Sequence, residues 1–592
     1  MNSKKWSIKH VSRFVITFSG VPSFVISNCS FSDNNGRGIA LKDIRADISI
    51  FTVSVFRNKA DGIAAERILG TIATSDTHSL NNSAHGIVIV DSSFKSFNLH
   101  QVSTKGNSRN GLYLVRVALN KSVVSNSVFS RNSLHGFAYT TGSGEVEFHN
   151  LTAAFNTYSG VRFYDGKTST RFLACNLSRN NEDGCCISNQ DGAHQFYNCT
   201  VSSNSRHGVS LYDVTRRNSN QPPRHQFKDF TLIDSVVNDN TQYGLKLGPE
   251  CQYWSESAVN VTMAISNNHI WRNSKGGIYL APDSCSFSSS SLRPRKIEAS
   301  VKENHFEENK ANAFYVYCTG FFGFDAVIES NKFINNTDKV LTLLDDNRCG
   351  ANYRSKPVNV EIRKNIFAKN RAQNILYIDY NSYPDTRFAT VTNNSFEDNE
   401  YISTDLFPNF FHRTTTRAVV VLKEGIFTLR ENIFENAGFA LQLSTLRHDH
   451  RRLIDAKYNW WGAENECEII DKIFDFRHRV QLSPVEFYPY FISSNKSRVC
   501  NSSILRPSCF LRKGAIGGVV DRPLALSIAD SPYEVRDDIV IVANGSLMIP
   551  KNVTLLFPPR SVLCVEFCLY DVVSSIMFPH RVILCSHPAV TL

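Results

Sequence analysis

The chain has 592 residues, of which 42% are hydrophobic and 20% charged, with a net charge of +10 and a pI near 8.8. This is the composition of a folded globular chain. The positive charge is mild for the length, and without a lysine-rich tail it argues against nucleic-acid binding. No run of 18 apolar residues occurs, which argues against a membrane-spanning helix in this stretch of sequence.

The N-terminal residues 1–28 alternate like a strand and do not resemble a signal peptide. Ser12-Arg13 and Ser19-Gly20 interrupt any apolar region that a signal would need. The first full repeat begins by Asn28, so we expect that the sequence starts inside a repeat, as a fragment of a longer protein would.

A short repeat occupies the sequence from Asn28 to Asp213. Each frame has an asparagine and, four residues later, a glycine. In several frames an apolar residue stands three residues before the asparagine, as in Val201, Asn204 and Gly208. The asparagines are Asn34, Asn58, Asn82, Asn107, Asn132, Asn156, Asn180 and Asn204, and the glycines are Gly38, Gly62, Gly86, Gly111, Gly136, Gly160, Gly184 and Gly208. A fixed period of about 24 residues indicates a solenoid whose units bury their apolar faces against neighbouring units.

The residues within each frame predict the kind of solenoid. Apolar residues alternate in short runs such as Val209 and Leu211, which is the periodicity of strands. Asn-x-x-x-Gly predicts a turn, in which glycine supplies a positive φ and asparagine bonds the backbone. Hairpins would not impose one step eight times, and the leucine-rich repeat pattern is absent. We therefore predict an all-β, right-handed parallel β-helix with one repeat per rung and stacked asparagines forming a ladder.

The rungs lengthen after residue 210. Gly244 and Gly277 follow at wider steps than the earlier glycines, with polar insertions at 216–224 and 286–296 that predict loops at one corner. Later frames lose the glycine but keep an aromatic residue and an asparagine: Phe306 and Asn309, Phe333 and Asn336, Phe367 and Asn370, and Phe396 and Asn399.

Four regions follow from these patterns: a parallel β-helix over 1–465, its C-terminal cap over 466–491, a linker over 492–530 and the start of a second, incomplete β-helix over 531–592. The cap is predicted from aromatic density around the Asn459, Trp460, Trp461 and Gly462 motif. The second β-helix is predicted from clean alternation over 531–559, and residues 566–592 follow no pattern.

The cysteines and glycosylation motifs predict an extracellular chain. Fifteen cysteines lack zinc-ligand spacing, and three pairs are candidates for disulfides that close loops: Cys251 with Cys285, Cys318 with Cys349, and Cys500 with Cys509. Cys175 and Cys199 hold equivalent positions in successive rungs. Candidate glycosylation sites are Asn81, Asn120, Asn260, Asn335, Asn393, Asn495, Asn501, Asn544 and Asn552. Asn28, Asn150, Asn176 and Asn198 recur in step, and their side chains are expected to point inward.

Two stretches resemble a known family. Asn459-Trp460-Trp461-Gly462, then Ile-Phe-Asp-Phe at 473–476, then Pro489-Tyr490 is similar to the ending of β-helix units in the bark beetle (Anakonda) family. The stretch 531–559 resembles the opening of a following unit. The resemblance implies a large animal membrane protein of tricellular epithelial junctions. The scavenger-receptor, lectin-like and membrane-spanning parts of that family do not occur in this sequence, so membrane association rests on the resemblance alone.

An enzyme is the rival hypothesis, because parallel β-helices include polysaccharide lyases and hydrolases. Hydrolysis needs two carboxylates facing one cleft, and lyases need acids for calcium and a basic residue. Adjacent acids occur at Glu307-Glu308, Asp345-Asp346 and Asp537-Asp538, and the loop 344–348 is the best candidate. The Gly-His-Gly and Arg-x-Lys elements of polygalacturonases are absent, so no catalytic residue is predicted.

Other chemically active residues have structural explanations. His85, His135 and His207 lie two and three rungs apart, which predicts surface turn residues and not a row of metal ligands. The run 448–452 predicts a solvated loop, Trp460 and Trp461 predict cap core, and Cys185 and Cys186 cannot both point inward on one strand.

The sequence thus predicts a non-enzymatic extracellular scaffold for adhesion at cell junctions, with no cofactor or metal site. Its expected partners are other cell-surface or junction proteins, and glycans. A glycan-binding module would instead use exposed aromatic residues and the basic loops at 216–224 and 293–296.

Overall fold

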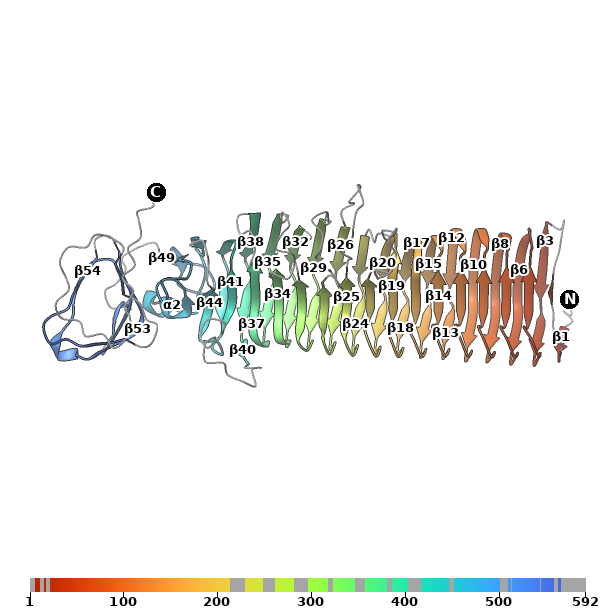
Figure 1. The fold of residues 1–592 in the computed structure, drawn as a ribbon, viewed down its shortest axis with the longest axis horizontal. Coiled ribbons are helices and arrows are strands. Elements are labelled where there is room, and N and C mark those ends of the chain that lie inside the picture. Colours follow the sequence, from red (N-terminus) through yellow and green to blue (C-terminus); the bar gives the residue numbers. More distant parts are fainter. Residues whose placement is uncertain are drawn as a thin grey trace, which may run out of the picture. The chain divides into compact units, whose positions relative to one another are not determined.

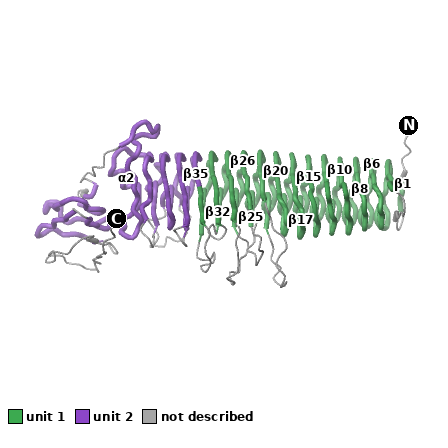
Figure 2. Tube along the Cα trace, turned by 90° about the horizontal axis from the view of Figure 1, so that it is seen from above, with its two compact units in different colours: residues 1–360 green, residues 361–592 purple. Residues whose placement is uncertain are grey.

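The computed structural model describes residues 6–10, 15–16, 22–212, 229–248, 261–281, 296–317, 323–345, 357–380, 386–402, 417–446, 452–500, 509–512, 514–542, 545–557 and 563–565. The chain divides into two compact units, residues 1–360 and 361–592 (Figure 2). Each unit is described here by itself.

The first unit is a coil of short parallel strands that stack in three rows (Figure 1). One row runs through β2 (Val15–Ile16), β5 (Ile39–Lys42), β7 (Ile63–Glu66), β9 (Ile87–Val90), β11 (Leu112–Val115), β14 (Phe137–Thr140), β17 (Val161–Leu173), β19 (Cys185–Gln190), β22 (Val209–Tyr212), β25 (Tyr243–Gly248), β28 (Gly276–Leu280), β31 (Asn312–Tyr317) and β34 (Thr337–Asp345).

The second row comprises β3 (Ser23–Ser27), β6 (Asp47–Phe56), β8 (Leu69–Leu80), β10 (Ser93–Lys105), β12 (Ala118–Ser125), β15 (Ser143–His149), β20 (Ala193–Tyr197), β23 (Asp229–Ile233), β26 (Val261–Ser266), β29 (Ile297–Lys302) and β32 (Phe324–Glu329). The third comprises β1 (Trp6–Lys9), β4 (Cys29–Ser32), β13 (Val128–Ser130), β16 (Thr152–Ala154), β18 (Asn176–Ser178), β21 (Thr200–Ser202), β24 (Val236–Asn238), β27 (His269–Trp271), β30 (His305–Glu307) and β33 (Lys332–Ile334). Four long strands bend at a corner, so that each belongs to two rows: β6, β8, β10 and β17.

The strand register equals the sequence repeat. Val161 pairs with Cys185, which pairs with Val209, so one repeat of the sequence adds one complete coil. All pairings within this coil are parallel, which confirms the predicted right-handed parallel β-helix and its rung length.

Aromatic rings from successive coils stack inside the first unit. Phe148, Phe172 and Phe196 are fully buried, with ring centroids 4.7 and 4.5 Å apart and planes within 11° and 4° of parallel. Offset stacking of buried rings adds to the stabilisation from their apolar burial. Identical residues at one repeat position therefore form the core between coils.

The second unit contains further coils of the same type, which end in a short helix. Its coil strands are β36 (Ile366–Ala368), β37 (Arg371–Tyr380), β38 (Arg387–Thr392), β39 (Ser395–Glu397), β40 (Glu400–Tyr401), β41 (Ala418–Lys423), β42 (Ile426–Arg430), β43 (Ile433–Glu435), β44 (Leu441–Thr445), β45 (Ile454–Asp455), β46 (Ile473–Phe474) and β47 (Val485–Glu486). β35 (Val358–Arg363) spans the sequence boundary between the units. Helix α2 (Glu466–Lys472) begins after Asn465, whose side chain accepts a hydrogen bond from the Cys467 N–H.

A smaller set of strands follows the helix. β48 (Tyr490–Phe491) pairs with β49 (Val499–Cys500), and a separate sheet contains β50 (Leu511–Arg512), β51 (Ala515–Val520), β53 (Tyr533–Ile541), β55 (Leu555–Leu556) and β56 (Leu563–Val565), beside the pair β52 (Pro523–Ala525) and β54 (Ser546–Met548). The range 492–530, for which a linker was predicted, thus contains strands that pair with those of 531–565. Ile516 and Val520 are buried in one cluster with Tyr533 and Ile539. Their burial shows that the described residues 514–530 contribute to a small core with residues 531–565.

Candidate functional site

The eight predicted asparagines form a continuous buried row at one corner of the first unit. The Nδ2 of each donates to the Oδ1 of the next at 2.8–3.1 Å, and the same Oδ1 also accepts the preceding backbone N–H. A second Nδ2 hydrogen atom reaches a main-chain carbonyl, as Asn180 does to Ala153 at 3.0 Å. Each amide is therefore fully hydrogen-bonded although its side chain is buried.

The row continues past the predicted frames. Asn204 bonds Asn240, and the chain of amides runs on through Asn273 and Asn309 to Asn336. In the second unit Asn370, Asn399 and Asn436 repeat the pattern.

A second asparagine row was not predicted. Asn268, Asn304 and Asn331 bond in series in the first unit, and Asn365, Asn394, Asn432 and Asn459 do so in the second. The sequence does contain the signal for this row. At positions 268, 304, 331, 365 and 394, an asparagine stands five residues before an asparagine of the first row. Earlier coils have other residues at this position, and at two of them a serine, Ser127 or Ser235, accepts a backbone N–H group.

The ladder glycines are needed for close packing and not for a positive φ. None of the eight has a positive φ, contrary to the turn expected from the sequence. A Cβ placed on Gly160 would lie 2.7 Å from the Gly184 carbonyl oxygen, and the other seven would meet the next glycine's oxygen at 2.5–2.7 Å. The positive φ angles at the corners belong to Asp43, Arg67, Asn150 and similar residues, because polar side chains tolerate the left-handed region.

A third polar row occupies the position just before each ladder glycine. His85 Nδ1 accepts the Asn110 N–H at 3.3 Å, Asn110 accepts from His135, and His135 Nδ1 accepts from Ser159 at 3.1 Å. His207 likewise accepts from Tyr243. The side chain at this position thus holds the backbone of the next coil.

The predicted surface role of the three histidines is wrong for two of them. His85 and His207 are 8% and 3% exposed, while His135 is partly buried. The three histidines lie in different coils, as predicted. Burial lowers the pKa of His85 and of His207 to about 4 and that of His135 to about 3. Their Nδ1 atoms are acceptors, so the rings are neutral in the fold.

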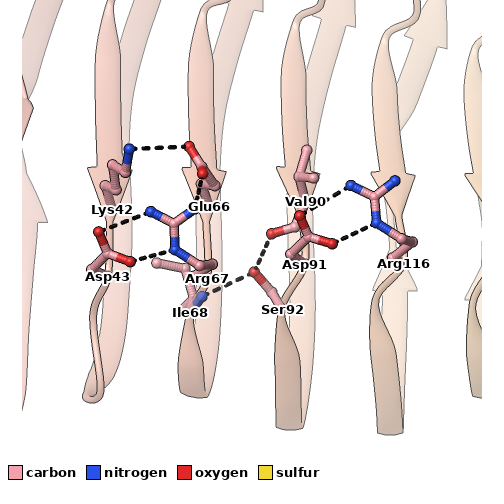
Figure 3. Close-up of polar contacts among 9 residues, drawn as sticks. All are labelled: Lys42, Asp43, Glu66, Arg67, Ile68, Val90, Asp91, Ser92 and Arg116. Carbon is pink, nitrogen blue, oxygen red and sulfur yellow. Dashed lines mark hydrogen bonds and ion pairs between the residues drawn. The ribbon is translucent and has the colours of Figure 1, made fainter.

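A charged row lies on the surface at another corner of the first unit (Figure 3). Arg67 contacts Asp43 with two guanidinium nitrogens, and Arg116 contacts Asp91 in the same way, with Nη2–Oδ2 distances of 3.0 Å. The hydrogen bonds from the arginines lower the pKa of Asp43 and of Asp91. Exposed pairs of this kind add little stability.

All six candidate glycosylation asparagines in the described residues are exposed. These are Asn81, Asn120, Asn335, Asn393, Asn495 and Asn552, whereas Asn260, Asn501 and Asn544 lie outside the described ranges. The inward orientation expected for Asn28, Asn150, Asn176 and Asn198 is wrong: Asn28 is half-buried and the other three are exposed. Asn28, Asn150 and Asn198 have φ of 51–52°, where the corner directs the side chain outward.

The adjacent acids do not converge in one groove of the described chain. Glu307 is partly buried beside His269, and Glu308 is exposed on the other side of the strand end. Asp345 is 2% exposed, while Asp346, the loops at 216–224 and 286–295, and His448 lie outside the described residues. Asp538 accepts hydrogen bonds from Arg479 at 3.1 Å and from the Val480 N–H at 3.0 Å. These bonds give its carboxylate a structural role.

A pocket of about 220 Å³ in the second unit is lined by three acids, Asp471, Asp521 and Asp537. It is also lined by Arg477, His478 and Arg536. Burial is the main cause of the raised pKa of Asp537, and the nearby charge of Asp471 acts in the same direction. Among the described residues we note this pocket as the place where a polysaccharide-cleaving function could be tested.

The disulfide expected between Cys500 and Cys509 is wrong. Cys509 is bonded to Cys467, with a Cα–Cα distance of 5.0 Å, and Cys500 is free. Because Cys467 is on helix α2, the bond ties this helix to the strands that follow it. Cys175 and Cys199 meet in successive coils as free, buried thiols. Cys251, Cys285, Cys318 and Cys349 lie outside the described residues.

Cys185 and Cys186 are both buried although their side chains alternate. Cys185 is 0% exposed within the core, and Cys186 is 2% exposed with its Sγ 3.4 Å from the Tyr212 hydroxyl. Tyr212 therefore covers the outward thiol, and both cysteines are free.

The Asn459–Gly462 motif ends two internal rows of the second unit, while the later strands β46 and β47 still pair with β44 and β45. Asn459 receives the last asparagine hydrogen bond, from Asn432, and donates to Leu429 and Ala456 carbonyls. Trp461 is fully buried and stacks on Phe434 with centroids 4.9 Å apart and planes 4° from parallel. Trp460 is partly exposed and donates to Glu435. Gly462 has a φ of 69° beside the Phe434 carbonyl, which excludes a side chain there.

Comparisons with known proteins agree with this architecture. The family model described as right handed beta helix region matches residues 5–122 and 115–263. Protein bark beetle of Drosophila melanogaster is 22% identical over 353 residues, or 56% of this chain. The resemblance to the bark beetle family is thereby confirmed as a weak similarity within the β-helix proteins. The chain spans only 11% of that relative's length.

One solved structure is similar at a low level. The A-module of the mannuronan C-5 epimerase AlgE6 of Azotobacter vinelandii aligns with 68% of this chain and 92% of its own, at 11% identity and a TM-score of 0.20. A similarity this low has no bearing on activity. None of the described helices is long and apolar enough to cross a membrane.

Proposed function

We propose that this chain is a non-enzymatic structural part of a larger cell-surface protein that supports adhesion at epithelial junctions. The observation that carries the proposal is the unbroken hydrogen-bonded asparagine row from Asn34 to Asn336, which fixes successive coils to one another. Such a row suits a rigid spacer, because its polar groups are committed to holding the fold together. The sequence similarity to bark beetle and the family's junction role support the location.

The localisation of the tagged endogenous full-length protein in an epithelium tests the proposal. We expect concentration at vertices where three cells meet, with other cell-surface or junction proteins, and glycans, as its neighbours. A membrane marker and a secreted marker in the same tissue serve as controls. Release into a lumen, without enrichment at cell contacts, would contradict the proposal.

A second candidate function rests on the pocket that contains Asp471 and Asp537. The pocket holds a carboxyl group with a raised pKa together with a second acid, and glycoside hydrolysis uses a pair of carboxyl groups. The purified chain would be screened against polysaccharides with and without calcium. Cleavage that is lost in Asp537→Asn and kept in Asp530→Asn, an exposed acid outside the pocket, would replace the scaffold proposal with a hydrolase.

A further inference from the structure

Two histidines and a glutamate meet on the outer face of the first unit. His269 in β27 pairs directly with His305 in β30, one coil away, and Glu307 is two residues further along the same strand. Ile270 and Phe306, the residues between, are fully buried in the core. Since side chains alternate along a strand, the two histidines and Glu307 project together to the outside.

The three side chains place their ligand atoms close together. His269 Nε2 is 3.1 Å from Glu307 Oε2, and His305 Nε2 is 3.7 Å from the same oxygen. The imidazole rings are stacked 4.8 Å apart and 19° from parallel. The ligand atoms all lie within 4.8 Å of one another, and no other such trio occurs in the described part of the chain.

A simple ion pair does not account for this arrangement. One protonated histidine would satisfy Glu307, but both Nε2 atoms face the same carboxylate oxygen. The Nε2 of His305 is buried and has no hydrogen-bond partner. His149 and Glu147 show the ordinary case, a single imidazole 3.0 Å from a carboxylate.

We propose that His269, His305 and Glu307 bind a divalent transition-metal ion of the Zn²⁺ class. Two imidazole nitrogens and one carboxylate oxygen are a ligand set that zinc uses, and they suit neither Ca²⁺ nor Mg²⁺, which prefer oxygen ligands alone. The ligands come from adjacent coils, so the ion links β27 to β30. The side chains are 28–38% exposed, which leaves a fourth coordination position open to water.

The residues on either side of the two histidines in this row limit the extent of the site. Val236 precedes His269 and Lys332 follows His305 in the strand register. Lys332 is exposed, so its long side chain can turn its charge into solvent. The site therefore spans two coils and does not continue as a longer metal row.

Calorimetric titration of the chelator-treated full chain with ZnCl₂ tests the proposal. We expect saturable binding of one Zn²⁺ by the wild type, and binding weakened roughly tenfold or more in His305→Gln and in Glu307→Gln, since each loses one of three ligands. MgCl₂ should not bind at this site. His149→Gln, which breaks a pair without a second imidazole, is the matched control and should bind as the wild type does.

Thermal unfolding gives a second readout that separates binding from folding. Zn²⁺ should raise the midpoint of the wild type and of His149→Gln, because a ligand bound only to the native state stabilises it. It should leave the midpoints of His305→Gln and Glu307→Gln unchanged. Equal zinc binding by all four proteins, or none by the wild type, would overturn the site.

Discussion

A residue of an internal row interacts with the equivalent residues of the preceding and the following coil. Asn180 illustrates this, because its Oδ1 accepts the N–H and Nδ2 of Asn156 while its own N–H and Nδ2 donate to Asn204. One side chain therefore satisfies polar groups on two other coils. A buried polar group that loses its partner costs about 1–3 kcal/mol, so the effect of a substitution spreads beyond its own repeat.

Replacing Asn180 with leucine should destabilise the fold by about 2–4 kcal/mol, since the two Asn156 donors and the Asn204 carbonyl oxygen lose a buried partner. Thermal or denaturant unfolding of the purified chain measures the effect. Asn98→Leu is the control, because Asn98 is exposed and bonds only the Ser96 hydroxyl in its surroundings. Equal midpoints for the two variants would show that the amide row carries no stability.

The buried histidines predict a pH dependence of stability. The pKa of His85 and of His207 falls from 6.5 to about 4 on folding, chiefly through burial. The unfolded chain therefore takes up protons first, and stability should fall as the pH drops from about 6.5 toward 4. His85→Asn keeps an acceptor, as Asn110 does at the equivalent position, but removes the titration.

Unfolding midpoints at pH 7 and pH 4.5 measure this. The loss on acidification should be smaller in His85→Asn than in the wild type, and unchanged in His78→Asn, whose side chain is 46% exposed. Identical losses in all three proteins would mean that His85 takes a proton in the folded state without penalty.

At the level of elements, the sequence predicted the repeating coil and its first asparagine row. It missed the second asparagine row, although this row repeats, and the contacts that occur once. The fixed step between frames and the Asn-Gly spacing suffice to derive the coil, because each repeat obeys the same local packing. The glycine role was misjudged, since contact with the Gly184 oxygen depends on the neighbouring coil and not on the local turn. The Cys467–Cys509 bond, the pocket with Asp537, and the convergence of His269 with His305 all depend on residues brought together by non-repeating lengths of chain.

At the level of the whole molecule, stability is built from contacts between neighbouring coils, so the last coil of a unit has one neighbour fewer. In the second unit, residues that continue the internal rows take the place of this missing neighbour. Phe367, Phe396 and Phe434 stack with centroids 4.8 and 5.0 Å apart, and Trp461 takes the next place. The predicted cap motif thus ends the aromatic stack and, through Asn459, the asparagine row.

Trp461→Ala should therefore destabilise the second unit by about 3–5 kcal/mol, because it removes a fully buried ring and leaves Phe434 stacked on Phe396 alone. Trp460→Ala is a matched control in the adjacent position: its ring is partly exposed and it loses one hydrogen bond to Glu435, so about 1 kcal/mol is expected. Denaturant unfolding and hydrogen exchange over 357–380 and 417–446 measure both. Since contacts in a coil pass from neighbour to neighbour, Trp461→Ala should speed exchange most around Phe434 and least around Phe367. Uniform exchange across these coils, or equal losses in the two variants, would show that the motif does not close the stack.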